Sequence, residues 1–363
     1  MKKIAFVEYD MSISGGVLTV IKDLAYHFKN NYETHMISLV QPISEQDMTE
    51  GIIYQSFDIG NGRVRKILSQ SILPLIKYVN ENKVDIVLLE GHFVAPLSIF
   101  LRYFTKAKVI FCDHGAIENQ LSHKLVTLYR KIGVNFSNYT VVLTQQSVKA
   151  YIKFLNASPK KISSIYNAVP ITFREAKNIY TGDKNKIITI TRLSEEKGLN
   201  LLVEVAEKLK EEALNKHWKW HIYGTGVLYD DLKQEIRDRS LDCFLSLKGF
   251  IQSPVKVFGD YDLSVLTSYR EGLPVVLLES LAMGVPPISF DVVTGPNEII
   301  KTGVNGILVK PYDINQMANE ISKLMNNVSL KKIYSDNSKD TLEKFLPEEV
   351  YSKWNDLFEE LIK

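Results

Sequence analysis

The chain has 363 residues, of which 45% are hydrophobic and 24% are charged, and this is the balance of a soluble protein large enough for two domains. No apolar run reaches membrane-spanning length, and Glu8 interrupts the N-terminal run too early for a signal peptide, so we expect a cytoplasmic protein. The two cysteines, Cys112 and Cys243, lie in apolar runs without metal-ligand or disulfide spacing, which indicates buried, inert thiols.

The chain begins with a pattern typical of a strand, a glycine loop and a helix. Residues 2–9 form an apolar run suited to a buried parallel strand, residues 12–16 are a turn signal, and a helical pattern follows. The pair Gly15 and Gly16 lacks the Gly-x-Gly-x-x-Gly spacing of dinucleotide-binding loops, which argues against a dehydrogenase. A tight turn between a strand and a helix explains the two glycines equally well.

Strand-like runs recur at 84–89, 108–112, 139–144 and 163–166, with helical stretches between them. This alternation predicts a doubly wound parallel sheet, whose ligands bind at the carboxyl ends of the strands. His92 follows one of these strands, and Asp113 and His114 follow the next. The place of His114 in a loop after a strand favours a functional role, whereas Asp113 and His92 are explained equally well as structural residues.

The charge is unevenly spread, because residues 1–175 carry 20 Lys and Arg against 14 Asp and Glu, and the remainder carries 24 against 28. Three basic groups punctuate apolar residues of the first half: Arg63, Arg65 and Lys66; Arg102, Lys106 and Lys108; and Lys124, Arg130 and Lys131. Such groups suit an anionic membrane surface or a lipid-diphosphate acceptor, and solvated helix faces explain them as well. Pro74 is expected to break the helical pattern that contains the first group.

Periodicity fades over residues 173–186, which we interpret as a linker to a second domain. A strand over 186–191 leads into Arg192 and Lys197, and an arginine fork with a lysine point charge can neutralise phosphate oxygens. A strand over 220–223 leads into a loop with Gly224 and Gly226, which is a weak phosphate signal by itself. Another strand, over 245–250, ends with Gly249 and Phe250.

Asp260 and Asp262 have the Asp-x-Asp spacing of a metal motif. They precede the strand expected at 263–267, so they would lie at the end of the sheet opposite to its ligand-binding edge. We therefore favour a structural role for both acids and expect no metal.

The stretch from Ser268 to Pro286 carries most of the chemistry. Glu271 and Glu279 stand eight positions apart on either side of Gly272-Leu273-Pro274, which is typical of a helix start, and Gly284 supplies the helix stop. A loop that enters a helix in this way presents free N–H groups to an anion such as a phosphate. The two acids are then best explained as acceptors for hydroxyl groups on either side of a diphosphate.

This stretch resembles the motif of retaining glycosyltransferases of the glycogen-synthase-like group, family 4, which includes bacterial surface-polysaccharide enzymes. Residues 294–306 and the segment from Arg192 to Gly198 also resemble that family. The resemblance implies transfer of a hexosyl unit from a UDP-sugar to a glycan or a polyprenyl-diphosphate-linked acceptor. It further implies retention of the anomeric configuration, no metal, no nucleic-acid partner, and a cytoplasmic place with optional peripheral contact to an anionic membrane.

The resemblance also assigns roles to individual residues. It makes His114, Arg192, Lys197 and Glu271 catalytic, and it gives donor-binding roles to Gly15, Gly16, Gly224, Gly226, Gly249, Phe250, Gly272, Leu273, Pro274 and Glu279. The two cations would stabilise the leaving diphosphate, and Glu279 would bind the ribose. Glu271 would hold hydroxyls of the donor hexose, and His114 would reach its 6-position.

The fold class implied is α/β with the GT-B architecture, in which two Rossmann-like doubly wound domains face each other across the active-site cleft. We expect an acceptor domain over residues 1–175, a donor domain over 176–345, and a helix over 346–363 that crosses back to the first domain. Trp354, Leu357, Phe358 and Leu361 give this helix an apolar stripe that needs a surface to cover.

Two other functions remain open from the sequence. A nucleotide-sugar epimerase shares the architecture but needs further acid and base groups around the hexose. A non-catalytic nucleotide-sugar-binding protein would keep the two cations and could lose Glu271.

Overall fold

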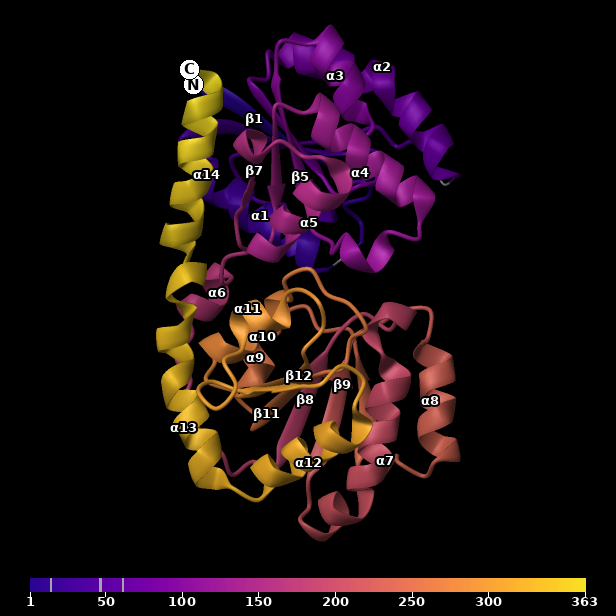
Figure 1. Cartoon of the computed structure of the whole chain (residues 1–363), viewed down its shortest axis with the longest axis vertical. Coiled ribbons are helices and arrows are strands. Elements are labelled where there is room, and N and C mark those ends of the chain that lie inside the picture. Colours follow the sequence, from indigo (N-terminus) through magenta and orange to yellow (C-terminus); the bar gives the residue numbers. More distant parts are fainter. Residues whose placement is uncertain (14, 46–47, 61) are drawn as a thin grey trace. The chain divides into compact units, whose positions relative to one another are not determined.

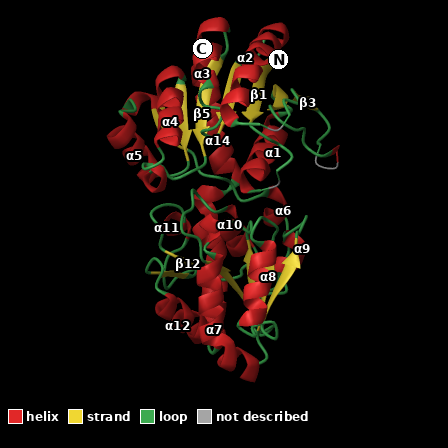
Figure 2. Cartoon of the chain, turned by 90° about the vertical axis from the view of Figure 1, so that its right-hand side faces the viewer, coloured by secondary structure: helices red, strands yellow, loops and turns green. Residues whose placement is uncertain are grey.

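The computed structural model describes residues 1–13, 15–45, 48–60 and 62–363 and divides the chain into two compact units. The first unit comprises Met1–Asn167 and Glu348–Lys363, and the second comprises Ala168–Pro347. Each unit has its own parallel sheet, with helices packed around it (Figures 1 and 2). Within the described residues, no helix is long and apolar enough to cross a membrane.

The sheet of the first unit has seven parallel strands in the order β3-β2-β1-β4-β5-β6-β7. The strands are β1 (Lys2–Glu8), β2 (Tyr32–Ser38), β3 (Ile52–Ser56), β4 (Ile86–Glu90), β5 (Lys108–Asp113), β6 (Tyr139–Val142) and β7 (Ile162–Ser164). The main helices are α1 (Gly16–Phe28), α2 (Val64–Asn82), α3 (Leu97–Phe104), α4 (Lys124–Phe136), α5 (Gln145–Leu155) and α14 (Pro347–Ile362). The strand order reverses between β1 and β4, and doubly wound sheets bind ligands at such a point.

Alternation along the central strands builds the core of this unit. Ala5 and Val7 of β1 point to the same face as Val87 and Leu89 of β4, and all four side chains share one apolar cluster with residues of α2 and α3. Because both faces of β1 and β4 are covered, the strands are apolar without interruption, as the sequence indicated.

The terminal helix α14 packs against the rest of the first unit through aromatic rings. The ring centroid of Phe358 lies 5.1 Å from that of Phe28 in α1 and 5.7 Å from that of Tyr32 in β2. Tyr351 lies 4.3 Å from His27 in the same way. Phe358 is fully buried, and its edge-to-face contacts with Phe28 and Tyr32 are an arrangement that aromatic pairs favour. The apolar stripe of α14 therefore covers a surface of the first unit.

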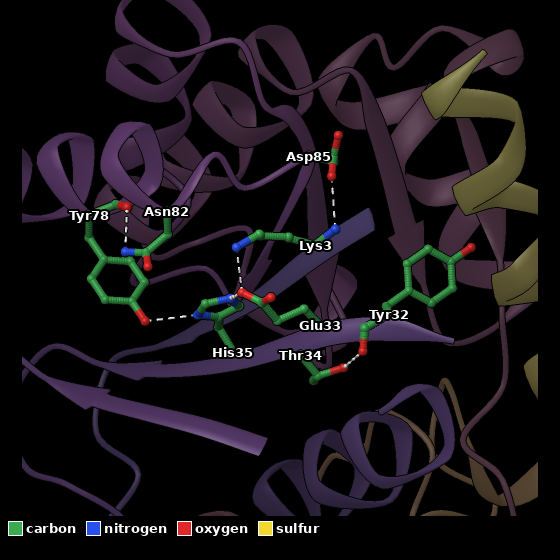
Figure 3. Close-up of polar contacts among 8 residues, drawn as sticks. All are labelled: Lys3, Tyr32, Glu33, Thr34, His35, Tyr78, Asn82 and Asp85. Carbon is green, nitrogen blue, oxygen red and sulfur yellow. Dashed lines mark hydrogen bonds and ion pairs between the residues drawn. The ribbon is translucent and has the colours of Figure 1, made fainter. Parts of the chain in front are cut away.

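A polar network joins β1, β2, α2 and the start of β4 (Figure 3). Lys3 donates to Glu33 through Nζ at 2.6 Å and to Asp85 through its backbone N–H at 2.8 Å. The fully buried His35 lies between Glu33, 3.1 Å from Nε2, and the Tyr78 hydroxyl, 2.8 Å from Nδ1. Burial lowers the pKa of His35 and outweighs the opposing effect of the Glu33 carboxylate.

The sheet of the second unit has six parallel strands in the order β10-β9-β8-β11-β12-β13. The strands are β8 (Lys186–Ile190), β9 (Lys219–Tyr223), β10 (Leu245–Gly249), β11 (Leu263–Leu266), β12 (Pro287–Phe290) and β13 (Ile307–Val309). The helices are α6 (Ile171–Arg174), α7 (Leu199–Asn215), α8 (Tyr229–Asp238), α9 (Val255–Phe258), α10 (Val275–Ala282), α11 (Pro296–Ile299), α12 (Ile314–Met325) and α13 (Val328–Ser338). Ile187, Trp220, Val265 and Ile288 from four of the strands share one core with α7, α8 and α12.

The segment interpreted as a linker packs on the second unit. The backbone N–H of Val169 donates to the carbonyl of Phe345 at 2.8 Å, and Asn178 donates through Nδ2 to the carbonyl of Met283 at 2.6 Å. The Tyr180 hydroxyl donates to the carbonyl of Asp262 at 2.8 Å. The second unit therefore begins at Ala168, because polar residues of low periodicity still make fixed contacts there.

Several local expectations were wrong. Pro74 lies inside a continuous α2, because Ile67, Leu75 and Val79 bury the helix on the sheet and outweigh the lost hydrogen bond. Cys112 is buried, but Cys243 is exposed. The short strands β3, β12 and β13 were not recognised, and residues 339–345 form a 3-10 helix after α13.

Two histidines with lowered pKa values, His35 and His221, lead us to expect that acid weakens the fold. Burial lowers the pKa of His35, and burial with the charges of Lys248, Lys186 and Lys219 lowers that of His221 to about 4. A folded pKa below the unfolded value of about 6.5 gives stability that is present above that pH and is lost as the pH falls through the folded pKa.

We therefore expect the free energy of unfolding to fall less steeply between pH 6.5 and pH 4 in His35→Gln and in His221→Gln than in the wild type, by at most about 1.4 kcal/mol per pH unit for each group. His221 is only partly buried, so its share is the smaller. Urea unfolding across this range measures the slope, and the exposed His217→Gln serves as the matched control. Equal slopes in all four proteins would contradict the assignment.

Candidate active site

The loops that follow β8, β9, β10 and β11 gather at the carboxyl edge of the second sheet and are fastened to one another. The backbone N–H of Leu193 donates to the carbonyl of Thr225 at 2.9 Å, and that of Gly224 donates to the carbonyl of Gly249 at 2.8 Å. The backbone N–H of Tyr269 donates to the carbonyl of Glu196 at 2.9 Å. Side chains carried by these loops are thus held on a common frame.

Two glycines make the close approach of these loops possible. A Cβ atom on Gly224, which has φ +145°, would lie 1.8 Å from the carbonyl oxygen of Thr191. A Cβ atom on Gly198, which has φ +59°, would lie 2.2 Å from the carbonyl oxygen of Thr267. Both positions exclude any other residue for reasons of loop packing, so their glycines need no phosphate to explain them.

Lys197 and Glu271 are brought into direct contact. Lys197 Nζ lies 2.8 Å from Glu271 Oε1, and the Ser268 hydroxyl donates to the same oxygen at 2.6 Å. The two charged side chains are 17% and 9% exposed, so the pair is largely removed from water. The loop is held further by the Thr294 hydroxyl, which donates to the backbone carbonyl of Glu271 at 2.7 Å. A cation and an acid thus stand together at the carboxyl edge of the sheet.

Arg192 belongs to the same loop as Lys197, and its side chain extends toward solvent. Its side chain is 58% exposed, and Nη2 lies 3.3 Å from Glu196 Oε1 in an ion pair between residues four apart. Exposed pairs of this kind contribute about 0–1 kcal/mol, so the guanidinium is free to exchange Glu196 for a stronger anion.

The predicted loop and helix around the two glutamates are present. Glu271 lies in the loop and Glu279 lies on α10, with Pro274 as the residue before the helix. Gly284 has φ +68° just after the helix, as a helix stop requires. Gly272 and Leu273 complete the loop. A Cβ atom on Gly295 would lie only 2.6 Å from the carbonyl oxygen of Gly272. Glu279 is partly buried on its helix.

The remaining predicted donor residues of this unit lie on neighbouring loops. Gly226 lies two residues after Gly224, and a Cβ atom on it would lie 2.3 Å from the carbonyl oxygen of Leu193. Gly249 ends β10 with φ +75° and open space around the position of a Cβ atom. Phe250 follows it and is 58% exposed.

His114, Gly15 and Gly16 belong to the first unit. His114 follows β5, and its Nε2 lies 2.7 Å from Glu90 Oε2 at the end of β4. Gly16 begins α1, and Gly15 is an extended residue before it, with no atom near the position of a Cβ. Ser14 of the same turn lies outside the described residues.

Asp113 is a structural anchor, and so is Arg130. Arg130 Nε lies 2.7 Å from Asp113 Oδ2, both side chains are fully buried, and the Tyr151 hydroxyl also donates to Asp113. Burial raises the pKa of Asp113, but the charges of Arg130 and His92 and the two hydrogen bonds together bring it below its usual value. The placing of Arg130 in a basic surface group was therefore wrong, since it serves the loop that carries His114.

Asp262 lies at the amino end of β11 and is buried. Its Oδ2 accepts a hydrogen bond from the backbone N–H of Asn185 at 2.5 Å, which fixes the segment before β8. Asp260 precedes it on the same side of the strand's start. Within the described ranges, no three His, Cys, Asp or Glu side chains are grouped so that they could hold a metal ion.

The sequence alone gave no supporting role to three residues that hold the site. Ser268 and Thr294 both hold the Glu271 loop, and Glu90 holds His114. The position of Ser268 three residues before Glu271 was a usable signal. Nothing in the sequence indicated the contact with Thr294, because it lies 23 residues further along the chain.

Two family models match the chain almost end to end. "Glycosyltransferase Family 4" matches residues 14–173, and "Glycosyl transferases group 1" matches residues 171–341. Among solved structures, a mutant of TarM from S. aureus, in complex with fondaparinux, alpha-GlcNAc-glycerol and UDP, is similar to the chain with a TM-score of 0.81. It is 18% identical, and the match covers 99% of this chain and 100% of that one.

Three curated proteins illustrate the range of relatives. The poly(ribitol-phosphate) alpha-N-acetylglucosaminyltransferase of Staphylococcus aureus is 34% identical over 47% of this chain, and the exopolysaccharide phosphotransferase of Streptomyces coelicolor is 32% identical over 61% of it. The chain spans only 34% and 23% of these two proteins.

The third relative, from Campylobacter jejuni, is N-acetylgalactosamine-N,N'-diacetylbacillosaminyl-diphospho-undecaprenol 4-alpha-N-acetylgalactosaminyltransferase. It is 24% identical, over 93% of this chain and 94% of its own.

Proposed function

This chain belongs to the group 1 and family 4 glycosyltransferases and has their GT-B fold, and we propose on that basis that it transfers a hexosyl unit from a UDP-sugar with retention of configuration. The acceptor is a glycan or a polyprenyl-diphosphate-linked glycan of a bacterial cell-surface polysaccharide. The observation that carries the proposal is the contact between Lys197 and Glu271 at the carboxyl edge of the second sheet.

The pair suits a donor because each member can exchange its partner for a part of a nucleotide sugar. Lys197 Nζ would move from Glu271 to the leaving diphosphate, and Arg192 would leave Glu196 to join it. The attraction between these two cations and the diphosphate then grows as negative charge develops on the departing phosphate. Glu271, still bonded to Ser268, would accept hydroxyls of the hexose.

The other residues surround the donor at the same edge. Glu279 would accept the ribose hydroxyls, and the loop Gly272-Leu273-Pro274 would offer N–H groups at the start of α10 to the diphosphate. Gly249 and Phe250 would contact the base of the nucleotide. The backbone of Gly224 and Gly226 would line the donor-binding site. For the first unit, the proposal keeps the roles that the family implies: His114 toward the 6-position of the donor hexose, and the loop of Gly15 and Gly16 toward the donor phosphate and the acceptor.

The relatives' names support the choice of donor and outcome. The TarM structure contains UDP, and the names of the Staphylococcus and Campylobacter relatives specify alpha-linked products. An alpha-linked product made from an alpha-linked nucleotide sugar is a retained configuration. No carboxylate of this site is assigned as a nucleophile, so we place the acceptor on the leaving-group face, with the departing phosphate taking its proton.

We expect Arg192→Ala and Lys197→Ala each to lower kcat about a hundredfold or more, because each removes charge stabilisation that grows as the diphosphate leaves. Product formation from a panel of UDP-sugars, followed by mass spectrometry, measures the loss and separates transfer from epimerisation or simple binding. Lys301→Ala removes an exposed cation of the same unit and is the control. Folded variants that keep near-full activity would refute the assignment.

Activity is expected to survive excess EDTA, because side-chain cations and helix N–H groups neutralise the diphosphate without a metal. The measurement is the transfer rate before and after chelation. Complete loss on chelation, restored by Mn²⁺ or Mg²⁺, would show that a metal is required and would reopen the question of Asp260.

One patch of the first unit would suit an acceptor held in a membrane. It lies where α3 contacts both α2 and α4 (Figure 1). Large apolar side chains on these helices are exposed: Leu73 by 77%, Tyr103 by 66%, Phe104 by 61% and Leu128 by 51%. Exposed basic residues lie on or next to the same helices, namely Arg63, Arg65, Lys66, Lys106, Lys124 and Lys131. Apolar contact and cationic charge together favour an anionic lipid surface.

We therefore expect the protein to bind vesicles rich in anionic lipid at low salt and to be released as salt rises, since each cation contributes about 1 kcal/mol within a Debye length of the surface. Replacing Arg63, Arg65 and Lys66 together with Gln should weaken binding and the use of a lipid-linked acceptor. Slow hydrolysis of the donor should be unchanged. A wild type that ignores such vesicles would show that the charges are only solvated.

A further inference from the structure

A row of buried polar side chains crosses the carboxyl edge of the first sheet. In the parallel registers, Glu8 of β1 pairs with Glu90 of β4, and Glu90 pairs with Cys112 of β5. Paired residues on neighbouring strands point to the same face, so the two carboxyl groups and the thiol stand side by side. Glu90 and Cys112 are each only 3% exposed.

The surroundings of this row shift the pKa values of its members. Burial, and then the charge of Glu90, raises the pKa of Glu8 well above its ordinary value, which favours the neutral form of this acid. Burial, with the charge of Glu90 and a hydrogen bond to it, likewise raises the pKa of the Cys112 thiol. Burial therefore favours the neutral forms of both neighbours of Glu90, the Glu8 acid and the Cys112 thiol.

His114 is the partner that Glu90 meets from outside the row. Its Nε2 lies 2.7 Å from Glu90 Oε2, and the side chains are 13% and 3% exposed. A carboxylate can only accept, so Nε2 carries the hydrogen of this bond. Among the described residues, Nδ1 of His114 is out of contact with solvent and has no hydrogen-bond partner.

The backbone on either side keeps the ring in this position. Asp113, the residue before His114, is fixed by the fully buried Arg130. A Cβ atom on Gly115, the residue after it, would lie 2.8 Å from the Arg130 guanidinium, so the loop has no room to shift toward α4. The remaining freedom of His114 is rotation of its ring, and the bond to Glu90 removes it.

We propose that Glu90 is a positioning residue for glycosyl transfer, which holds His114 with Nε2–H toward itself and leaves Nδ1 as the acceptor for a substrate hydroxyl. This rests on the proposed function, because it gives the His114 ring a substrate to meet. Glu90 itself touches His114 and not the substrate. A hydroxyl seated against Nδ1 would satisfy a buried acceptor that otherwise has no partner among the described residues.

The test combines Glu90→Leu, Glu90→Gln, His114→Ala and the two double variants that join each Glu90 substitution to His114→Ala, with Glu8→Gln as the matched control. Losing a carboxylate that orients a histidine costs about 10- to 100-fold in metal sites, and we expect a fall in kcat at the lower end for Glu90→Leu. Glu90→Gln keeps an acceptor oxygen and should lose less. Glu8→Gln should stay near the wild-type rate, because the bond to His114 is made by Glu90 and the amide resembles the neutral acid that burial favours.

The decisive comparison is made without His114. If Glu90 acts only through the ring, adding Glu90→Leu or Glu90→Gln to His114→Ala causes no further loss of kcat. Losses that multiply in the double variant would overturn the proposal and make Glu90 a structural residue. The Glu90→Gln pair decides this even when Glu90→Leu fails to fold.

A second readout needs no activity. In ¹⁵N-histidine-labelled protein, the bonded Nε2–H of His114 should give a slowly exchanging downfield signal, assigned by its absence from His114→Ala. It should persist in Glu8→Gln and vanish in Glu90→Leu, and its survival in folded Glu90→Leu would overturn the proposal. A wild type that shows this signal but transfers nothing from any nucleotide sugar would refute the proposed function instead.

Discussion

The strands of both sheets run parallel, so the loop after every strand emerges at the same edge. This brings Lys197, which follows β8, to 2.8 Å from Glu271, which follows β11 and is 74 residues away in sequence. In the first unit it brings His114 to 2.7 Å from Glu90, across 24 residues. Because the ladders fix the strand ends, these side chains meet without needing to be neighbours in the chain.

Two ion pairs at these edges serve different purposes, and their surroundings show why. Arg130 and Asp113 are both fully buried, and Tyr151 and Gln120 bond to them as well, so breaking the pair would leave a buried charge at a cost of about 3–5 kcal/mol. Lys197 and Glu271 are 17% and 9% exposed and share one short contact. The first pair therefore fixes a loop, whereas the second keeps some exposure to solvent, as the proposed exchange of partners requires.

The second unit is an insertion within the first in sequence terms, because the chain leaves the first unit after Asn167 and returns at Glu348. The return depends on α14, whose Phe358 and Tyr351 pack on rings of α1 and β2. Residues more than 300 positions apart thus complete one core. Such a contact forms only after both ends of the chain are ordered. Closing a loop of that length costs entropy, and the favourable free energy of the contact is gained only afterwards.

The sequence by itself determined the α/β class, the strand–loop–helix units, the loop and helix around Glu271 and Glu279, and the family, because apolar periodicity, glycine and proline act over a few residues. It misplaced Arg130 and Pro74, since burial against distant elements outweighs the ordinary preferences of a charge or a proline. Only the tertiary structure decided which groups meet: Thr294 with the Glu271 loop, and Glu90 with His114. These contacts depend on strand order and register, which no local pattern encodes, and so the positions of the candidate residues could be read from the sequence but their partners could not.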